Sequence, residues 1–345
     1  MKVAVTGANG FIGSRFVALY RNRLEIVALG SENAPLDNSE LLIEKTKDVD
    51  VVVHCAFDHS YRHNITGIRN LLKACDANKI QKLVHLSSFS VYDHNIVGEL
   101  NESCDYSTYN DIYTKEKQSI ERILIDEGKN MTSIIILQPT VVYGLGGNWS
   151  RYAFYACRGA NIRLPENGNC ICNAVYVDDV AQAIYKSCLA DIKFDKFIIS
   201  SQEPVKWKDF YKAHNQVLKA IGLDVQCSIT SSNSNEFHNS KVFNFIFSIL
   251  FETFLGSSLS YPIVFAKRLR SKRFVMPIKK NELLAHLATP RNHTLTEPIA
   301  VTRKVHFCNF YAGIDKANRL LLYSPDYDFN GGTNELENQI MSMGQ

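Results

Sequence analysis

The first part of the chain alternates short runs of β-branched residues with longer segments in which apolar residues recur every three or four positions. Val and Ile favour strands, whereas the longer spacing predicts helices with one apolar face. The predicted strands are Lys2–Thr6, Ile26–Leu29, Val49–His54, Leu83–Ser87 and Ile134–Leu137. The predicted helices are Gly13–Tyr20, Ile65–Ala77, Tyr113–Asp126 and Asp178–Leu189. Strands that alternate with helices pair in parallel, so the pattern predicts an α/β fold with a doubly wound parallel sheet.

Composition limits the class of protein. The chain has 345 residues, of which 46% are hydrophobic and 21% charged, as in a folded globular protein. Its 38 basic and 35 acidic residues nearly balance, which argues against a protein that binds nucleic acid through the phosphates. The nine cysteines are scattered and lie mostly in apolar runs, as buried thiols in a reducing compartment do. The chain starts with a predicted strand rather than a secretion signal, so we expect a cytoplasmic protein.

A basic region lies in the second half of the chain. Residues 241–319 contain 13 Lys and Arg against 4 Asp and Glu. They include the apolar stretch Val242–Phe265, which polar residues and Pro262 interrupt too often for a transmembrane helix. One interpretation is that residues 242–273, which end in a basic cluster, make a peripheral contact with an anionic membrane surface. The interpretation that we favour is a helical cap with a solvated basic rim, or a dimer face.

A glycine-rich turn follows the first predicted strand and opens the first predicted helix. Its sequence is Thr6-Gly7-Ala8-Asn9-Gly10-Phe11-Ile12-Gly13. Glycines permit a tight turn and a close approach of the backbone, while a helix N-terminus offers unpaired N–H groups and the positive end of its dipole. This combination suits the pyrophosphate of a dinucleotide. The position of the turn makes an ordinary strand-to-helix connection the weaker interpretation.

A tyrosine and a lysine lie one helical turn apart. Tyr113 and Lys117 are four positions apart and so share a helix face. A phenol has a reference pKa of about 10, and a neighbouring ammonium lowers that pKa, so that the phenol can exchange a proton near neutral pH. Ser88, on the preceding strand, can hydrogen-bond the same substrate oxygen. Ser88, Tyr113 and Lys117 are therefore the predicted catalytic residues.

These motifs resemble those of the extended short-chain dehydrogenase/reductases, a superfamily that includes the NAD-dependent epimerase/dehydratase family. Four further segments resemble the family in order: Asp50–Ala56, Asn64–Leu72, Lys82–Tyr92 and Leu137–Gly144. Glu121 extends the Tyr113–Lys117 pattern as in the family's catalytic helix. The resemblance covers most of residues 1–200 and returns at 313–332, whereas 205–310 carry no recognisable motif.

The resemblance implies a Rossmann-type domain that binds NAD or NADP. That domain is expected at residues 1–170 with a return segment at 174–200, and a smaller, mostly helical substrate domain at 205–345, to which loops after Gly144 contribute. The implied cofactor-binding residues are Gly7, Asn9, Gly10, Phe11, Ile12, Gly13, Ser31, Asp37, Ala56, Tyr113, Lys117 and Pro139. The candidate substrate contacts are Asn64, Ser88, Thr140, Trp149, Arg151, Tyr152 and Asn173. We expect no metal, because the histidines show no converging set of ligands.

The cofactor region departs from the family pattern. The second strand ends at Gly30, where NAD-preferring members carry Asp or Glu. Arg15 and Ser31 are candidates to bind a 2′-phosphate, which tips an open choice towards NADP, and Asp37 is a candidate near the adenine. The interval from Leu29 to Asp50 is short, too short for a full helix and strand.

Two further departures concern the reaction. Gln138 stands where members usually carry Arg, which puts a charge-dependent role there in doubt. Phe89-Ser90 replaces the Asp-Glu pair that follows the catalytic Ser or Thr in 4,6-dehydratases, so we discount dehydration. Farther along, Asp178 and Asp179 are expected to cap the helix that follows them.

The resemblance implies hydride transfer at an alcohol or ketone carbon of a nucleotide-diphosphate sugar. Net oxidation or reduction and 4-epimerisation use the same proton-transfer residues, so both stay open. One alternative is a 3β-hydroxysteroid-dehydrogenase-like oxidoreductase for an apolar alcohol, and another is a non-catalytic NADP-binding sensor. We expect a homodimer, as is common in the family.

Overall fold

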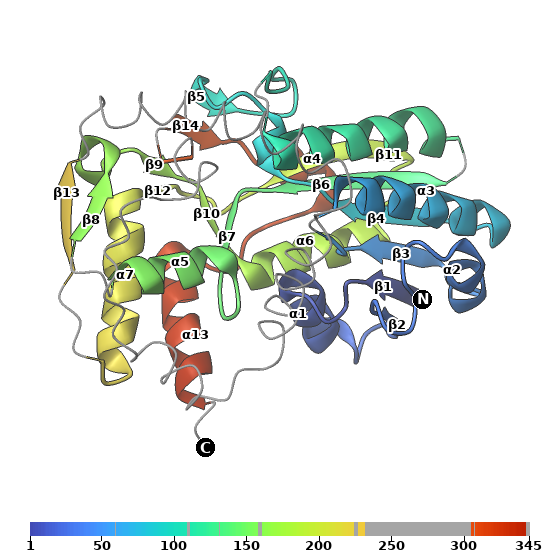
Figure 1. The fold of residues 1–345 in the computed structure, drawn as a ribbon, viewed down its shortest axis with the longest axis horizontal. Helices are drawn as coiled ribbons and strands as arrows, with labels where there is room; N and C mark the ends of the chain where they lie inside the picture. The colour runs from blue at the N-terminus through green and yellow to red at the C-terminus, as the bar shows by residue number, and fades with distance from the viewer. Residues whose placement is uncertain are drawn as a thin grey trace, which may run out of the picture.

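Six parallel strands form the central sheet, in the order β11-β6-β4-β3-β1-β2 (Figure 1). The structure is a computed structural model that describes residues 1–58, 60–108, 111–130, 132–157, 161–223, 227–231, 305–306 and 308–342. The strands of this sheet are β1 (Lys2–Thr6), β2 (Glu25–Leu29), β3 (Val51–His54), β4 (Lys82–Leu86), β6 (Ser133–Pro139) and β11 (Phe194–Ile199). The doubly wound Rossmann-type sheet is therefore confirmed, and five of its strands overlap the runs predicted from the sequence.

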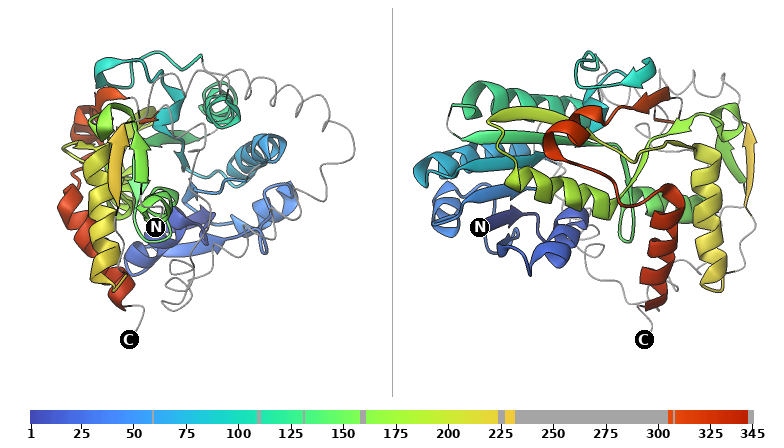
Figure 2. Two further views of the ribbon diagram at one scale, coloured as in Figure 1. Left: turned by 60° about the vertical axis from the view of Figure 1, so that its left-hand side comes forward. Right: turned by 180° about the vertical axis from the view of Figure 1, so that it is seen from behind.

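Helices cover both faces of the sheet, as the two further views show (Figure 2). They are α1 (Phe11–Tyr20), α2 (Ser39–Lys45), α3 (Tyr61–Ala77), α4 (Ile112–Ile123) and α6 (Val177–Leu189). One face carries α2, α3 and α4, whose apolar residues share a core with the strands, and the other carries α1 packed against α6. The chain thus passes from one face to the other and back, as in doubly wound folds.

The connection between β2 and β3 contains a helix and no strand. Asn38 caps α2, since its side-chain oxygen accepts the Leu41 N–H at 3.0 Å. Seven helical residues fill the interval, and the chain then enters β3 directly. The interval was expected to be too short for both elements, and it holds only the helix, which leaves β2 at the edge of the sheet.

A second group of elements lies beside the sheet. Its helices are α5 (Asn148–Cys157), α7 (Trp207–Ala220), α12 (Asp315–Leu321) and α13 (Phe329–Ser342). Short two-stranded pairs join them: β14 (Asn309–Ala312) with β5 (Val97–Leu100), β13 (Ser228–Ser231) with β8 (Asn161–Leu164), β12 (Val205–Lys206) with β9 (Ile171–Cys172), and β10 (Ala174–Tyr176) with β7 (Val141–Tyr143). Single turns occur at η1 (Phe89–Val91), η2 (Leu124–Gly128) and η3 (Pro165–Gly168). The α7 helix packs on α5 and α13, whereas α12 returns to β11 of the central sheet.

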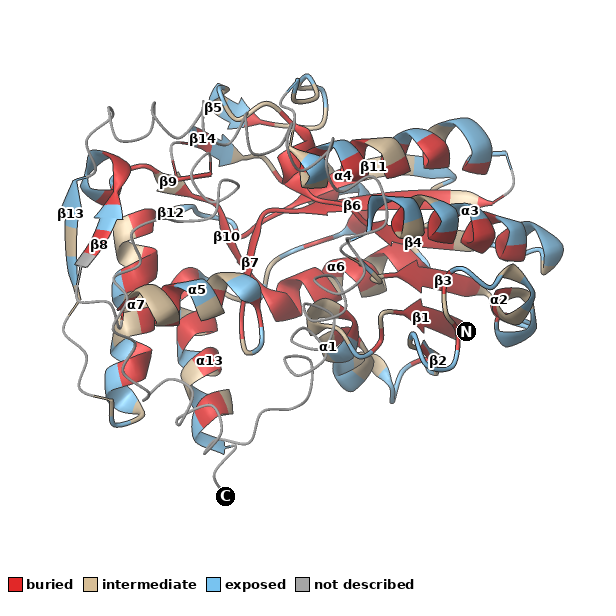
Figure 3. Cartoon of the chain, in the orientation of Figure 1, coloured by how far each residue is buried: buried red, intermediate tan, exposed pale blue. Residues whose placement is uncertain are grey.

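Burial follows the layers (Figure 3). The central strands β3, β4 and β6 are almost wholly buried, and exposed residues lie on the outer helix faces. Six of the nine thiols are buried, and all nine are free. Within the described ranges, no helix is long and apolar enough to cross a membrane. The membrane contact considered for residues 242–273 lies outside the described residues.

Candidate active site

The glycine-rich turn fits a dinucleotide because its backbone is packed too closely for side chains. Gly7 has φ +68°, and a Cβ there would lie 2.6 Å from the Ala56 backbone nitrogen. A Cβ on Gly13 would overlap the Gly7 carbonyl oxygen. The turn therefore brings β1, the start of α1 and the residues after β3 together at the carboxyl edge of the sheet. Gly7, Gly13 and Ala56 lie where the sequence places the cofactor.

The first turn of α1 is open to an anion. Gly10 is the N-cap and offers no side chain to cap the helix, and no acidic residue lies in the first turn. The Phe11 ring packs against the loop before α5. The contact is so close that a Cβ added to Gly147 would lie 2.6 Å from Phe11 Cζ. The glycine-rich turn Thr6–Gly13 is called the glycine cradle. An uncapped helix N-terminus beside this turn is suited to a pyrophosphate. Gly10, Phe11 and Ile12 supply this turn.

The end of β2 carries no carboxylate on its last residues. The Gly30 N–H donates to Asn33 Oδ1 at 2.7 Å, and the Asn9 side chain lies against Gly30. Ser31 and Asp37 are both exposed, so each is accessible to a ligand. Gly30 therefore leaves this end of the adenosine site open.

Arg15 is paired within the chain. Its guanidinium forms a two-pronged ion pair with Asp178 of α6, with Nη2 2.6 Å from Oδ2. Asp178 raises the pKa of Arg15 through this contact. A role for Arg15 in binding a 2′-phosphate would compete with this ion pair, and the choice between NAD and NADP stays open. Asp178 and Asp179 do not cap α6 either: Tyr176 is the N-cap, and Asp179 accepts the Asp326 N–H at 2.7 Å.

Tyr113, Lys117 and Ser88 meet at the carboxyl end of β4. Asp111 caps α4 by accepting the Thr114 N–H at 2.8 Å, which places Tyr113 in the first turn and Lys117 in the next. Ser88 follows β4 and caps η1, and its side chain lies close enough to Tyr113 to offset part of the rise that burial causes in the pKa of that phenol. Lys117 Nζ donates to the Leu86 carbonyl at 2.9 Å. The three predicted catalytic side chains therefore lie together.

Burial governs the proton affinities of these groups in the free chain. Desolvation raises the pKa of Tyr113, and the nearby Ser88 side chain partly offsets this rise. Desolvation lowers the pKa of Lys117 to about 8, against the opposing effect of Glu116 and Glu121. Lys117 Nζ lies 5.9 Å from the centre of the Tyr113 ring. The pKa of Tyr113 is therefore raised by burial, whereas the sequence predicted that the neighbouring ammonium of Lys117 would lower it.

Asn64 ties the loop after β3 to α4. Its Nδ2 donates to the Asp58 carbonyl at 2.6 Å and to Glu116 Oε1, and its Oδ1 accepts the Asp58 N–H at 2.9 Å. Asn64 is buried and its amide is engaged within the chain. This arrangement favours a structural role at the site over direct contact with substrate.

Glu121 centres a buried network behind the site. It is fully buried and accepts hydrogen bonds from Ser87, Tyr106 and Gln138, the last at 3.0 Å. Gln138 in turn accepts the Tyr92 hydroxyl at 2.8 Å. The neutral Gln138 amide thus bonds directly to the carboxylate, which joins α4 to the ends of β4 and β6.

The candidate substrate contacts separate into two groups. Thr140 donates to Ser200 Oγ at 3.0 Å, and Asn173 donates to the Phe310 carbonyl at 3.0 Å and accepts the Ala312 N–H at 2.9 Å. Both are buried, so they join strands rather than face a ligand. Trp149, Arg151 and Tyr152 were expected in a loop but lie on α5. Their helical placement follows from the Gly144–Gly147 turn, after which α5 begins at Asn148.

The aromatic residues of α5 belong largely to a cluster beside α7. Trp149 packs against Trp207, with ring centres 5.3 Å apart, and Tyr152 meets Trp149 edge-on. The predicted cofactor contact Pro139 lies elsewhere, at the end of β6, where it pairs in register with Ile199. These positions are consistent with packing, and Tyr152, which is 40% exposed, is the accessible member.

Phe57 is a site residue that the sequence motifs did not reveal. Its ring centre lies 4.6 Å from Lys117 Nζ, and it meets the Tyr113 ring edge-on at 5.4 Å. The one available signal was position, because Phe57 follows Ala56 directly after β3, at the edge where ligands bind in such sheets. His54 and His85, by contrast, are core residues, as expected, and stack at 5.2 Å.

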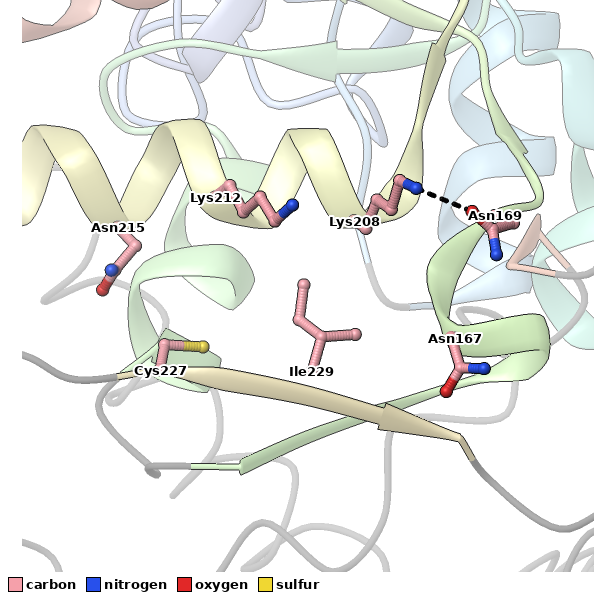
Figure 4. A pocket seen from close by; sticks show the side chains of 7 residues that line it. All are labelled: Asn167, Asn169, Lys208, Lys212, Asn215, Cys227 and Ile229. Atoms are coloured by element: carbon pink, nitrogen blue, oxygen red, sulfur yellow. Dashed lines mark hydrogen bonds between the residues drawn. The ribbon is translucent and has the colours of Figure 1, made fainter.

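A separate pocket of about 300 Å³ lies away from these residues (Figure 4). Lys208 and Lys212 of α7 line one side, and Ile229 of β13 and Cys227, just before that strand, line the other. Lys208 Nζ donates to Asn169 Oδ1 at 2.8 Å across its end. None of the predicted site residues lines this pocket. Among the described residues, no group of three potential metal ligands comes together, and the absence of a metal stays a prediction.

The chain is similar to known proteins in sequence and in fold. The chain is 24% identical over 255 residues to a 2-alkyl-3-oxoalkanoate reductase of Stenotrophomonas maltophilia, a match that covers 64% of this chain and 76% of that enzyme. The fold resembles the UDP-N-acetylglucosamine 4-epimerase of Bacillus cereus, with TM-score 0.66, 19% identity, and coverage of 100% of this chain and 98% of that one. It also resembles the UDP-glucuronic acid 4-epimerase of Bacillus cereus in complex with NAD, with TM-score 0.63, 18% identity and full coverage of both chains.

A sequence model of the NAD dependent epimerase/dehydratase family matches residues 3–193, which is more than half of the chain. The matched range contains the glycine cradle, Ser88, Tyr113 and Lys117. The chain therefore belongs to the NAD dependent epimerase/dehydratase family.

Proposed function

We propose that this protein transfers hydride between a nicotinamide dinucleotide and a secondary alcohol or ketone, with Ser88, Tyr113 and Lys117 moving the proton. The observation that carries the proposal is that Ser88, Tyr113 and Lys117 lie together after β4, at the edge of the sheet where the glycine-rich turn follows β1. When bound, the nicotinamide supplies or accepts the hydride. The chain's own residues position the reacting oxygen and exchange its proton.

In the direction of reduction, the substrate carbonyl oxygen accepts hydrogen bonds from the Ser88 and Tyr113 hydroxyls. As hydride reaches the carbonyl carbon, Tyr113 gives its proton to the oxygen, and the alcohol forms. Protonated Lys117 stabilises the resulting phenolate and holds a cofactor ribose hydroxyl. The reverse sequence oxidises an alcohol. An epimerase returns the hydride to the other face of the ketone, whereas a reductase releases its product.

We propose a nucleotide-diphosphate sugar as the substrate. The support is the likeness in fold to two UDP-sugar epimerases over nearly the whole chain. The match to a 2-alkyl-3-oxoalkanoate reductase supports a second candidate, an apolar ketone or alcohol. Two exposed apolar side chains favour it as well: Phe57, which is 42% exposed and meets the Tyr113 ring, and Ile112, which precedes Tyr113 in the chain and is 63% exposed.

A substrate screen separates these two candidates. Turnover of NAD and NADP is followed with UDP-, GDP- and dTDP-sugars, and separately with sterols and 2-alkyl-3-oxoalkanoates. Turnover only with the lipid-like compounds contradicts the sugar proposal. Mass spectrometry of the purified protein adds the reaction type, because a retained NAD supports epimerisation and an exchangeable site supports net oxidation or reduction.

A tyrosine variant tests the chemistry itself. Tyr113→Phe removes the proton donor and should lower kcat/KM by about a hundredfold or more, the usual contribution of general acid–base catalysis. Tyr311→Phe, at an exposed tyrosine on β14, is the matched control and should leave the rate unchanged. Full activity in Tyr113→Phe would refute the assigned proton transfer, and absence of turnover in the wild-type chain with every substrate class would favour a non-catalytic, dinucleotide-binding role.

A further inference from the structure

An aromatic ring covers the ammonium group of the catalytic lysine. The Phe57 ring centre lies 4.6 Å from Lys117 Nζ, within the range of a cation–π contact. Lys117 is 5% exposed whereas Phe57 is 42% exposed, so the ring forms part of the cover between the ammonium and solvent. Lys117 also donates to the Leu86 carbonyl, from the strand side. A ligand hydroxyl that reaches Nζ therefore has to replace the ring.

The backbone on both sides of Phe57 is fixed. Ala56 lies against Gly7 so closely that a Cβ on the glycine would clash with it. Asp58 exchanges two hydrogen bonds with Asn64, at 2.9 and 2.6 Å, and Asn64 also bonds Glu116 of the catalytic helix. Displacement of the whole loop would break these contacts. Rotation of the half-exposed ring about its side-chain bonds breaks only its own contacts with Lys117 and Tyr113.

We propose that Phe57 gates the cofactor ribose, because its ring occupies the face of Lys117 that the ribose hydroxyls require and turns aside when the dinucleotide binds. This inference rests on the proposed function, in which Lys117 holds that ribose. In the arrangement described, the ring shields the ammonium from solvent. Binding of the dinucleotide exchanges the cation–π contact for hydrogen bonds, so Phe57 lowers the affinity for the cofactor.

The test is calorimetric measurement of dinucleotide affinity in the full chain. NAD⁺, NADP⁺ and AMP are titrated into the wild type, Phe57→Ala and Phe57→Leu. AMP lacks the second ribose and is the control ligand. Phe57→Ala should bind the preferred dinucleotide about twofold to thirtyfold more tightly, the range that corresponds to one cation–π contact, with AMP affinity unchanged. Phe57→Leu keeps part of the cover without the aromatic face and should fall between the two.

A double variant tests whether the effect passes through the lysine. In a Lys117→Met background, Phe57→Ala should give no further gain in dinucleotide affinity, because the contact it removes is already absent. Thermal unfolding of each variant shows whether it folds.

The outcomes separate the gate from the proposed function. Unchanged or weaker binding of the dinucleotide by Phe57→Ala, in a wild-type chain that does bind it, overturns the gate and leaves the proposed function standing. The same gain in the Lys117→Met background also overturns it. Failure of both the wild type and Phe57→Ala to bind either dinucleotide overturns the two together.

Discussion

Asp179 carries a buried carboxyl group whose charge is poorly compensated, and this makes stability depend on pH. The residue is fully buried; its Oδ1 accepts the Asp326 N–H at 2.7 Å, while Oδ2 has no hydrogen-bond partner among the described residues. Burial raises the pKa of Asp179 from 3.8 to about 7, and the charges of Asp326 and Asp178 act in the same direction.

The sign and size of the effect follow from the two pKa values. The unfolded chain releases this proton near 3.8 and the folded chain near 7, so between these values the folded state binds more protons. The free energy of unfolding therefore falls as pH rises through this window and levels off above it. A difference of about three pKa units, at about 1.4 kcal/mol each, sets an upper limit of about 4 kcal/mol.

The perturbation is Asp179→Asn, which keeps an oxygen acceptor for the Asp326 N–H and removes the titration. Urea unfolding followed by circular dichroism at about pH 5, 6, 7 and 8 gives the free energy of unfolding for each protein. The variant should gain on the wild type as pH rises, by up to about 3 kcal/mol between about pH 5 and 8, because part of the total change lies below pH 5. Asp126→Asn, at an exposed carboxylate, is the control and should not change the slope. A difference between Asp179→Asn and the wild type that is the same at every pH would refute the reasoning.

Four further variants or probes test other parts of the structure. Arg15→Met leaves the buried Asp178 carboxylate unpaired and should lower the free energy of unfolding by about 1–3 kcal/mol, a modest loss because the arginine is partly exposed. Adding Asp178→Asn should restore much of the lost stability, and no restoration would argue against the pairing. Glu121→Ala leaves three donors without an acceptor, of which Ser87 and Gln138 are buried, and should cost about 3 kcal/mol or more in urea unfolding. Glu121→Gln should cost less, and equal losses would count against the network. The pKa of His54 is lowered to about 3, mainly by burial, so its ring signals in histidine NMR should not titrate between about pH 5 and 8, and a midpoint in that range would contradict its burial. Gly13→Ala places a methyl group on the Gly7 carbonyl and should weaken dinucleotide binding measured by calorimetry at least about tenfold, and wild-type affinity would contradict the packing of the turn.

Local sequence signals predicted the centre of the fold and the side-by-side placement of the candidate residues Tyr113 and Lys117. The strand runs and the Gly7–Gly13 turn depend on residues that are adjacent in the chain, and Tyr113 and Lys117 share a face because one helix carries both. The short interval before β3 also revealed the missing strand, since chain length sets a limit that no packing can change. In each case the physical cause lies within a few residues.

Contacts between distant segments could not be predicted in this way. Arg15 and Asp178 are 163 positions apart, so nothing near Arg15 showed that its charge is already paired. Asn173 has a polar side chain in a stretch that resembles a loop, yet this side chain bonds to the backbone of β14. Its partner, the Phe310 carbonyl, lies 137 positions away in the chain. Phe57 carries no motif at all, and its role depends on how the loop after β3 lies over α4.

The Glu121 network also fixes the lengthwise position of the catalytic helix. A helix held only by apolar contacts can slide or rotate on a sheet at small cost, but Glu121 receives donors from the ends of β4 and β6 and from Tyr106. A slip of one residue would turn the Tyr113 side chain by about 100° around the helix axis and remove it from Ser88. The Glu121 carboxylate therefore fixes the position of α4 along the sheet. Sequence changes on the outer face of α4 can accumulate without altering the alignment of the Tyr113 hydroxyl.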